Sequence, residues 1–483
     1  MRLLFIGFII IAIISCTKTE TTPVPPPVVI IEEELIKFST IPDNTVGNIT
    51  TSNDTIGIWI NISSKLPAAG VNFSVELKNS DNNNSILKLD SSSSASSFRI
   101  KINNLFVKGN YTLDITVTSK SKATNKSTQT IKIEKALKSS YEIFLTSQWL
   151  PMPNGFASFA QFDYNRDGLT DLLEFQGYDL RIPYTWPGPN FYKNNGTSLV
   201  LDNSISINNK RIFAEEIING DFDNDGYIDA FLLTGMDGAG CGNCREELTP
   251  MYLLKNNKGT GFLVDSLNYN GVWEAGASAD IDGDGDLDIL AFSLHHEYAP
   301  GLINRTFIND GKGNFSYKAN DIDTIRWVDH AQLIDMNKDG FADLVINNVP
   351  SGSFYSNRLS ILWNNKSGGF SYANSIDIKV PNDLYFIQLL AYDVDGDGYK
   401  ELVLPMIDFN GKAQVLIYKT TDNKSYINST STLIPNNQIS IPPQVLGTFT
   451  ISDIDGNGSL DLFVVDKNKN QRWEWTGTSF LKK

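Results

Sequence analysis

Apolar and polar residues alternate in short runs along most of the chain, a pattern that predicts β-strands with one buried face. Within residues 35–137 the alternation is clear in Ile56–Ile62, Val71–Val75 and Tyr111–Val117. Roughly seven such strands in about 100 residues are expected for an immunoglobulin-like β-sandwich. Gly109-Asn110-Tyr111, which opens a late strand, fits the tyrosine corner of that class. Because this range contains no cysteine, no disulfide joins the two predicted sheets.

A second pattern repeats six times between residue 138 and residue 483. In each repeat an apolar strand enters an acidic loop and another apolar strand leaves it, and then a variable connection leads to a third strand, a turn and a fourth strand. Four strands in a repeat of about 58 residues predict one blade of a β-propeller, whose radial closure leaves few open sheet edges. We therefore expect an all-β protein in which an immunoglobulin-like β-sandwich precedes a propeller of six motif-bearing blades. The predicted third strands are Phe191–Asn195, Tyr252–Asn257, Thr306–Asp310, Ile361–Asn365, Val415–Tyr418 and Arg472–Trp475.

The acidic loop is clearest at Asp280–Asp288, which reads D-x-D-x-D-G-x-x-D and runs into the apolar Ile289–Phe292. Carboxylates at loop positions one, three and five converge on one cation only if the chain curls tightly, and Gly285 at position six accepts the positive φ that the curl needs. Asp288 at position nine closes the shell. Oxygen ligands suit Ca²⁺, whereas zinc prefers nitrogen and sulfur. The closing acid at position nine and the lack of flanking helical periodicity distinguish the loop from an EF-hand.

The same order of ligands recurs in six loops, whose first aspartates lie 55–60 residues apart. Chance acidic turns between strands are the alternative, but they would not need one ligand order at a fixed period. We therefore expect the chain to hold up to six Ca²⁺ ions. The predicted ligands are Asp163, Asn165, Asp167 and Asp171; Asp221, Asp223, Asp225 and Asp229; Asp280, Asp282, Asp284 and Asp288; Asp335, Asn337, Asp339 and Asp343; Asp393, Asp395, Asp397 and Glu401; and Asp453, Asp455, Asn457 and Asp461.

These repeats resemble the FG-GAP/VCBS family, the calcium-loop propeller repeats of integrin α chains and of many bacterial surface proteins. The resemblance covers roughly residues 140–483 and implies a propeller fold and bound calcium. Integrin-type propellers have seven blades, so a degenerate seventh blade from residues 140–160 and the C-terminus stands as the alternative to six. Asn165, Asn337, Asn457 and Glu401 depart from the commonest ligand types of the family, although each still offers an oxygen.

The N-terminus predicts export. Residues 1–15 carry Arg2 and then the apolar run Leu3–Ile14, which is too short to span a bilayer but has the size of a signal-peptide core. The run ends at Ser15-Cys16, which resembles the lipobox of bacterial lipoproteins, where the cysteine is lipidated; an ordinary secretory signal is the alternative. Residues 16–34, rich in Pro, Thr and Glu, predict a stiff spacer. We expect an outer-membrane lipoprotein, at the cell surface or on the periplasmic face.

Charge narrows the choice of partners. The formal net charge is −15, and six divalent cations would neutralise most of it. The acidity is therefore explained by ligands and does not require a cationic partner. No basic stripe is present, which argues against a nucleic-acid partner.

The connections between second and third strands offer candidate ligand contacts. The first of them, residues 176–189, carries Tyr178, Tyr184 and Trp186 together with Arg181. Flat aromatic rings beside polar groups suit stacking on sugars and are also favoured at protein interfaces. The alternative is that these side chains pack over the end of their own blade. The favoured function is a binding or adhesion module for a glycan or protein ligand.

A second cluster lies at the start of the first strands, which line the central channel of a propeller. It consists of acids with one histidine, and such groups could perform acid–base chemistry as a polysaccharide lyase or hydrolase. The favoured alternative is a hydrated channel mouth or a further cation site. The cluster comprises Glu215, Glu216, Glu274, Asp329 and His330, with Gln388 in the fifth repeat.

The two remaining cysteines form a C-x-x-C in the second of the variable connections. Cys241 and Cys244 lie among glycines, and His295 and His296 lie in the corresponding connection of the next repeat. Two thiolates and an imidazole suit zinc. In an oxidising compartment, however, a close cysteine pair more often forms a disulfide, which is the interpretation we favour.

Overall fold

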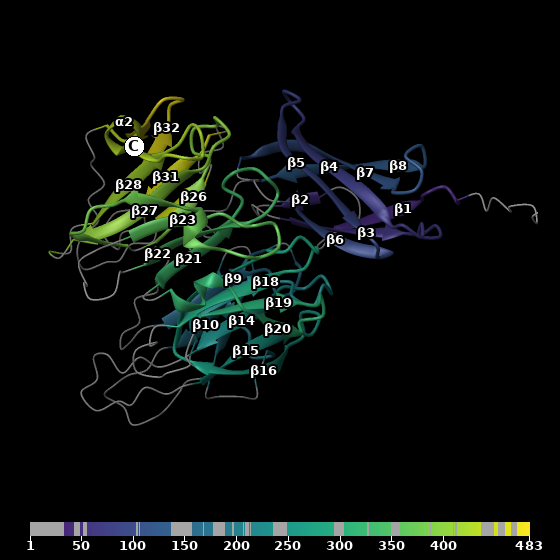
Figure 1. The fold of residues 1–483 in the computed structure, drawn as a ribbon, viewed down its shortest axis with the longest axis horizontal. Helices are drawn as coiled ribbons and strands as arrows, with labels where there is room; N and C mark the ends of the chain where they lie inside the picture. The colour runs from purple at the N-terminus through teal and green to yellow at the C-terminus, as the bar shows by residue number, and fades with distance from the viewer. Residues whose placement is uncertain are drawn as a thin grey trace, which may run out of the picture.

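The structure is a computed structural model, and it is all-β (Figure 1). It describes residues 33–42, 49–51, 56–102, 105, 107–136, 157–167, 169–176, 189–195, 198–205, 207, 212, 214–234, 249–293, 304–325, 328–348, 358–386, 388–408, 410, 413–435, 449–452, 459–464 and 471–483. The predicted signal peptide, Cys16 and all but the last two residues of the spacer lie outside these residues.

The N-terminal part consists of two sheets that face each other across one apolar core. One sheet has the strand order β1-β3-β6 and the other the order β2-β8-β7-β4-β5, with β2 parallel to β8. Their inward residues, such as Ile58, Val75 and Ile115, are fully buried. The eight strands exceed the seven expected. They are β1 (Phe38–Pro42), β2 (Ile49–Thr51), β3 (Ile56–Ile62), β4 (Val71–Asn79), β5 (Ser85–Ser93), β6 (Ser97–Ile102), β7 (Gly109–Ser119) and β8 (Lys126–Lys135).

Tyr111 occupies the place that a tyrosine corner requires. Its ring is buried near the start of β7, and its hydroxyl donates to the carbonyl of Val107 at 2.7 Å. The hydrogen bond runs to the backbone four residues upstream, which is the geometry of a tyrosine corner. It fixes the turn into β7 while the ring fills the core.

The described part of residues 138–483 forms six small antiparallel sheets in chain order. Five of these sheets have four strands. The remaining one, fifth along the chain, has five strands because its first strand is divided in two. This arrangement is that of a β-propeller-like fold, and each sheet is called a blade here. The strands of blades one to three are β9 (Ala157–Phe162), β10 (Asp171–Gln176), β11 (Asn190–Asn194) and β12 (Leu199–Leu201); β13 (Ala214–Gly220), β14 (Asp229–Thr234), β15 (Thr249–Asn256) and β16 (Phe262–Gly271); and β17 (Trp273–Ala279), β18 (Asp288–Ser293), β19 (Arg305–Asn309) and β20 (Phe315–Lys318).

Blades four to six follow the same plan. Their strands are β21 (Val328–Ile334), β22 (Asp343–Asn348), β23 (Arg358–Leu362) and β24 (Ser375–Lys379); β25 (Leu384–Phe386), β26 (Leu390–Tyr392), β27 (Glu401–Asp408), β28 (Ala413–Lys419) and β29 (Ile427–Asn428); and β30 (Phe449–Ser452), β31 (Asp461–Val464), β32 (Gln471–Trp475) and β33 (Phe480–Lys482). The third strands differ from the predicted ones only at their ends. Short helical turns are η1 (Asp321–Thr324), η2 (Tyr372–Asn374) and α2 (Thr430–Leu433). Within the described residues, no helix has the length and hydropathy needed to cross a membrane.

The blades pack face to face in sequence order. The first strands of blades one to four lie beside one another and form the inner edge. Five apolar clusters join blade one to two, two to three, three to four, four to five and five to six. Second strands such as β14 and β18 are buried at every position because each is covered on both faces. Continuous apolar runs after the acidic loops are the sequence signal of this packing.

Candidate metal centre

The acidic loops join first to second strands, so they all lie at the same end of their blades. In blades two to five the carboxylate at position one accepts a hydrogen bond from the backbone N–H of the glycine at position six. The N–H thereby draws the loop into the curl that the sequence predicted. The pairs are Gly226 to Asp221 (3.0 Å), Gly285 to Asp280 (3.0 Å), Gly340 to Asp335 (3.0 Å) and Gly398 to Asp393 (2.9 Å).

In loops two to five, which the structure describes in full, two positions adopt a left-handed backbone. The glycine at position six does so, with φ of 93° at Gly226 and 99° at Gly285. Position four does so as well, and here the residue need not be glycine. Arg166 has φ of 61° and Lys338 has φ of 64°. The glycines predicted the left-handed backbone at position six. The left-handed backbone at position four was not predicted, although glycine or asparagine occupies that position in four of the six loops.

The acid at position nine is buried and braces the loop. In blade three, Asp288 is fully buried, and its carboxylate accepts the N–H of Ile281 at 3.0 Å and that of Asn309 at 2.9 Å. It therefore ties position two of the loop to the third strand. The same two hydrogen bonds are made by Asp171, Asp229 and Asp343, with Asn194, Asn256 and Asn364 as the third-strand donors.

Burial has a marked electrostatic effect on the closing acids. It raises their pKa because a charged carboxylate loses hydration when it is enclosed. Neighbouring acids of the same loop push in the same direction, and the backbone hydrogen bonds oppose it. The raised values are about 8 for Asp171, Asp229 and Glu401, about 7 for Asp288 and about 6 for Asp343. Such carboxyls are ionised most easily when a cation lies beside them.

In blades two to four the third-strand asparagine links the acidic loop to the loop of the preceding blade. The Asn309 side chain donates to the carbonyl of Leu287 in its own blade at 3.0 Å and to the carbonyl of Phe222 in blade two at 2.7 Å. Asn256 and Asn364 make the same pair of bonds, reaching Tyr164 and Ile281. The predicted third strands contain these asparagines near their ends, but a role between the blades was not predicted. The signal was available, because an asparagine ends the third strand in four successive repeats.

Removing this link should destabilise the propeller. Asn309→Ala would leave two buried carbonyls without their donor, together with the N–H of Gly313, which donates to Asn309 at 3.1 Å. We expect the free energy of unfolding, measured with urea, to fall by about 2–4 kcal/mol. The matched control is Asn314→Ala, because the exposed Asn314 amide bonds only within its own turn, to Asp310. Equal losses in both variants would contradict a link between the blades.

Neighbouring loops also touch directly, through position four of one blade and position seven of the next. Arg166 lies over the ring of Tyr227 at 4.9 Å, and Lys338 lies over the ring of Tyr399 at 4.7 Å. Asn224 donates to the Asp286 carboxylate at 2.7 Å. Between blades three and four, a Cβ on Gly283 would lie 2.8 Å from the Phe341 ring, so only glycine at position four leaves room for this ring. In loops one to four, the residue at position four therefore complements the residue at position seven of the next loop.

The loops fit a hard cation. Three of them bring acid oxygens within 4.8 Å of one another, and in blades three and five the acid at position nine takes part. A carboxylate oxygen of Asp282 and one of Glu401 are buried without a hydrogen-bond partner. A buried acceptor without a donor is costly unless a cation satisfies it. The clusters are Asp221, Asp223 and Asp225; Asp280, Asp282 and Asp288; and Asp393, Asp395 and Glu401.

Loops one and four use an asparagine at position three. The Asn165 oxygen accepts the N–H of Asp167 at 3.0 Å, and the Asn337 oxygen accepts that of Asp339 at 2.9 Å. The aspartate of loop two makes the same turn, from Asp225 to Asp223 at 3.2 Å. The amide therefore preserves the local turn. Of the sixth loop, only Ser459, Leu460 and Asp461 are described, so its other predicted ligands, Asp453, Asp455 and Asn457, are not placed.

Lysines on or near the third strands contribute positive charge to some loops. Lys193 lies 3.1 Å from Asp167, and Lys366 lies 3.4 Å from Asp339. In blade five, Lys419 contacts both Asp395 and Asp397, the latter at 2.8 Å. The loops thus share one backbone geometry but differ in the charge that surrounds them.

The acids predicted at the channel lie at equivalent irregularities of the first strands. In blades two, three and four the register between the first and second strands shifts by one residue at the same place, and the residue that the register skips is Glu215, Glu274 or Asp329. Such bulges redirect a side chain. In blade five the first strand is interrupted at the corresponding point, between Phe386 and Leu390, where Gln388 lies. Four blades therefore depart from regular pairing at one level of the channel.

Three of the channel groups, Glu216, Asp329 and His330, have shifted pKa values. Burial raises the pKa of Glu216 to about 8, although its carboxylate accepts the N–H of Gly276 from the next blade at 2.7 Å. Desolvation raises the pKa of Asp329 and lowers that of its neighbour His330. The described contacts connect Glu216 to backbone and Asp329 to His330.

Several predicted residues lie outside the described part of the chain. They are Tyr178, Arg181, Tyr184 and Trp186, the pair Cys241 and Cys244, and the pair His295 and His296. Their predicted roles stay predictions.

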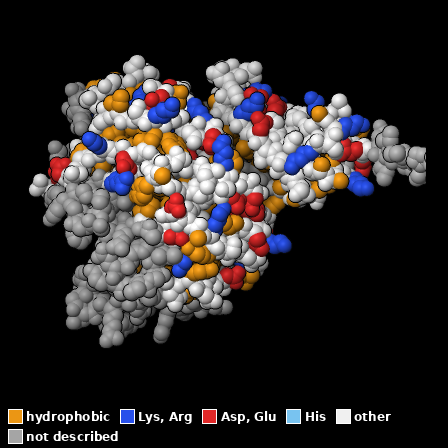
Figure 2. Space-filling model, viewed as in Figure 1, with side chains coloured by type: hydrophobic (Ala, Val, Ile, Leu, Met, Phe, Trp, Pro, Cys, Tyr) orange, Lys and Arg blue, Asp and Glu red, His pale blue; other side chains and the backbone are white. Residues whose placement is uncertain are grey.

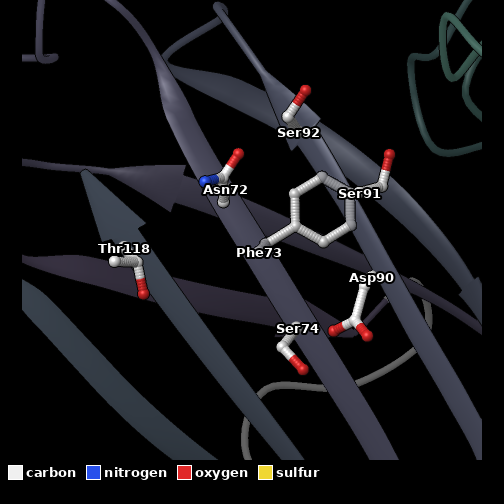
Figure 3. Close-up of a pocket in the computed structure, with 7 residues that line it drawn as sticks. All are labelled: Asn72, Phe73, Ser74, Asp90, Ser91, Ser92 and Thr118. Carbon is white, nitrogen blue, oxygen red and sulfur yellow. The ribbon is translucent and has the colours of Figure 1, made fainter. Parts of the chain in front are cut away.

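The N-terminal sheets carry one shallow hollow (Figure 3). It lies on the outer part of strands β4, β5 and β7, and most of the side chains around it are hydroxyls or amides. Phe73 is the one ring among its lining residues, and it stacks in the core on Phe98 with 4.8 Å between ring centres. The hollow is lined by Asn72, Phe73, Ser74, Asp90, Ser91, Ser92 and Thr118. It offers no ligand set comparable to that of the loops.

Comparison with known proteins adds one finding. A family model for the FG-GAP-like repeat matches residues 280–346. The match begins at position one of the third loop and ends in the second strand of blade four, so it spans one full repeat and the loop that follows. No curated protein matches the chain.

Proposed function

We propose that the chain is a calcium-stabilised propeller that acts as a binding module of an exported lipoprotein. The observation that carries this proposal is the loop geometry repeated from blade to blade, with its buried closing acids and its unpartnered oxygens in Asp282 and Glu401. Up to six Ca²⁺ ions, held by the loop carboxylates and amides, would neutralise these acids. The ions would supply structural stability, not chemistry, because each closing acid braces a loop against a third strand.

The face opposite the loops is the proposed binding face. Second strands leave the acidic loops and end at that opposite face, where the connections to the third strands depart; in blades one to three these connections span 11–14 residues and are longer than the acidic loops. The N-terminal sheets contact the loop side instead, since Arg99 of β6 forms an ion pair with Asp221. In Figure 1 the N-terminal sheets accordingly lie to one side of the blades. With the anchor at Cys16, this arrangement would direct the binding face away from the membrane.

A glycan or a protein is the proposed ligand. The support is the sequence of residues 176–189, whose aromatic and basic side chains suit either class. On the face seen in Figure 2, basic and acidic side chains are interspersed over both parts of the molecule. That distribution does not favour a nucleic acid, which needs a continuous basic surface.

A glycan array tests this proposal. The purified chain, with calcium present, should retain at least one glycan or, in a parallel screen of surface-protein fragments, one protein. The variant Trp186→Ala should lose at least tenfold in affinity, while Trp475→Ala in blade six should bind normally. Absence of any ligand in both screens would contradict a binding module.

A second candidate is a polysaccharide lyase or hydrolase that uses the channel. The observation in its favour is that three successive blades place an acid at an equivalent bulge, beside Glu216 with its pKa of about 8 and His330. Product formation from the retained polysaccharide, lost in Glu216→Gln, would favour the enzyme. Retention without product favours the binding module.

A further inference from the structure

One loop of the propeller is in contact with the N-terminal sheets. Asp221, at position one of the blade-two loop, lies with its carboxylate 3.4 Å from the guanidinium of Arg99. The Asp221 side chain is completely buried, and that of Arg99 is 11 % exposed. The pair is therefore enclosed between two parts of the chain more than 100 residues apart, and it is not a solvated surface ion pair.

A second contact supports the first. Trp59 is the cross-strand neighbour of Arg99 on β3, and its indole nitrogen lies beside Gly226. A Cβ added to Gly226 would be 3.0 Å from that nitrogen and 3.1 Å from the guanidinium of Arg166 in blade one. Trp59 and Arg99 together thus cover the curl of the blade-two loop. We call these residues, Trp59 and Arg99 with Asp221 and Gly226, the joint.

The joint lies on ligands that the proposed calcium site needs. Asp221 belongs to the acid cluster with Asp223 and Asp225, so the carboxylate that pairs with Arg99 would also bind the cation. Two positive charges that share one carboxylate repel each other, and each reduces the negative charge available to the other. Asp221 accepts the N–H of its own Gly226, just as Asp280 and Asp393 accept the N–H groups of Gly285 and Gly398. The guanidinium of Arg99 is thus an additional partner of a carboxylate that already has the hydrogen bond of its loop.

We propose that Arg99 and a calcium ion compete for Asp221, so that calcium in the blade-two loop and docking of the N-terminal sheets weaken each other. This inference rests on the proposed calcium binding by the loops. Coupling between two binding events is reciprocal, so the factor by which docking lowers calcium affinity equals the factor by which calcium loosens docking. The joint is thereby sensitive to calcium in the blade-two loop.

Hydrogen–deuterium exchange of the full chain, followed at increasing free calcium, tests the joint. Peptides over residues 221–229, 280–288 and 393–401 report three loops separately. In Arg99→Gln, we expect the calcium concentration that half-protects residues 221–229 to fall roughly five- to tenfold, a typical size for coupling between sites. The midpoints of the other two loops should not move, which also shows that the variant is folded.

Two further variants make the test specific. Arg99→Lys keeps the positive charge and should stay close to the unaltered chain. Arg358→Gln removes an arginine that pairs with Asp377 in blade four, 2.6 Å apart and away from the joint, and should shift none of the three midpoints. If calcium protects the loops but Arg99→Gln leaves the blade-two midpoint unchanged or raises it, the competition is wrong. If calcium protects none of the loops, the proposed calcium binding fails first.

Discussion

Chelation of calcium is expected to lower the melting temperature of the propeller by on the order of 10–20 °C. Each occupied site adds about 2.7 kcal/mol when free calcium is a hundredfold above its dissociation constant, and several sites add up. Without the ions, buried acids such as Asp229 and Asp288 lie close to other carboxylates of their loops, and this repulsion opposes folding. Differential scanning calorimetry in excess EDTA measures the effect.

The N-terminal sheets provide an internal control for the chelation experiment. Their core is apolar and separate from the cores between the blades, and their transition should keep its temperature. Returning calcium should restore the propeller transition, whereas the same ionic strength of sodium chloride should not. A melting curve that excess EDTA leaves unchanged would refute the metal interpretation of the loops.

The Asp288→Ala variant should lose about 4 kcal/mol of unfolding free energy. Its carboxylate is fully buried and is the acceptor for the N–H groups of Ile281 and Asn309, which alanine would leave unsatisfied. Each buried donor without a partner costs about 1–3 kcal/mol, and the loss of a cation ligand adds to this. Urea denaturation in calcium-containing buffer measures the difference.

A matched aspartate from the adjacent blade separates this effect from a loss of charge alone. Asp265 pairs with Lys255 at 3.2 Å, and its side chain is 56 % exposed. Asp265→Ala should therefore change the unfolding free energy by no more than about 0.5 kcal/mol. Similar losses at Asp265 and Asp288 would mean that the closing acid does not brace its loop.

Much of the fold was predictable because the strand pattern and the acidic loop recur at regular intervals along the sequence. Period-two alternation marked the strands before residue 137, and the fixed interval between acidic loops marked six sheets, all of which the structure contains. The extra strand of the N-terminal part was missed because β2 has three residues and no alternating pattern of its own. The local sequence pattern also does not predict that Trp59 and Arg99 contact the blade-two loop, because this contact depends on how the N-terminal sheets pack against the blades.

The candidate site was predictable as far as it follows from spacing. Gly285 and its equivalents were expected to be left-handed, and the four that the structure describes, Gly226, Gly285, Gly340 and Gly398, are. The left-handed backbone of Arg166 and Lys338 was not predicted, because residues with long side chains rarely adopt a positive φ. The conformational cost of the positive φ is offset here by the contacts of Arg166 with Tyr227 and of Lys338 with Tyr399 in the next blade. Asn309 was missed for a similar reason, since its partners come from two different blades.

The central claim, that the loops hold calcium, is tested most directly by counting bound ions. Native mass spectrometry of the calcium-equilibrated chain should find several ions and no more than six, released together by EDTA. Asp282→Ala, which removes one ligand whose oxygen is buried without a partner, should lower the count by one and leave the fold intact. A chain that binds no calcium, or an Asp282→Ala count equal to that of the unaltered chain, would contradict the account.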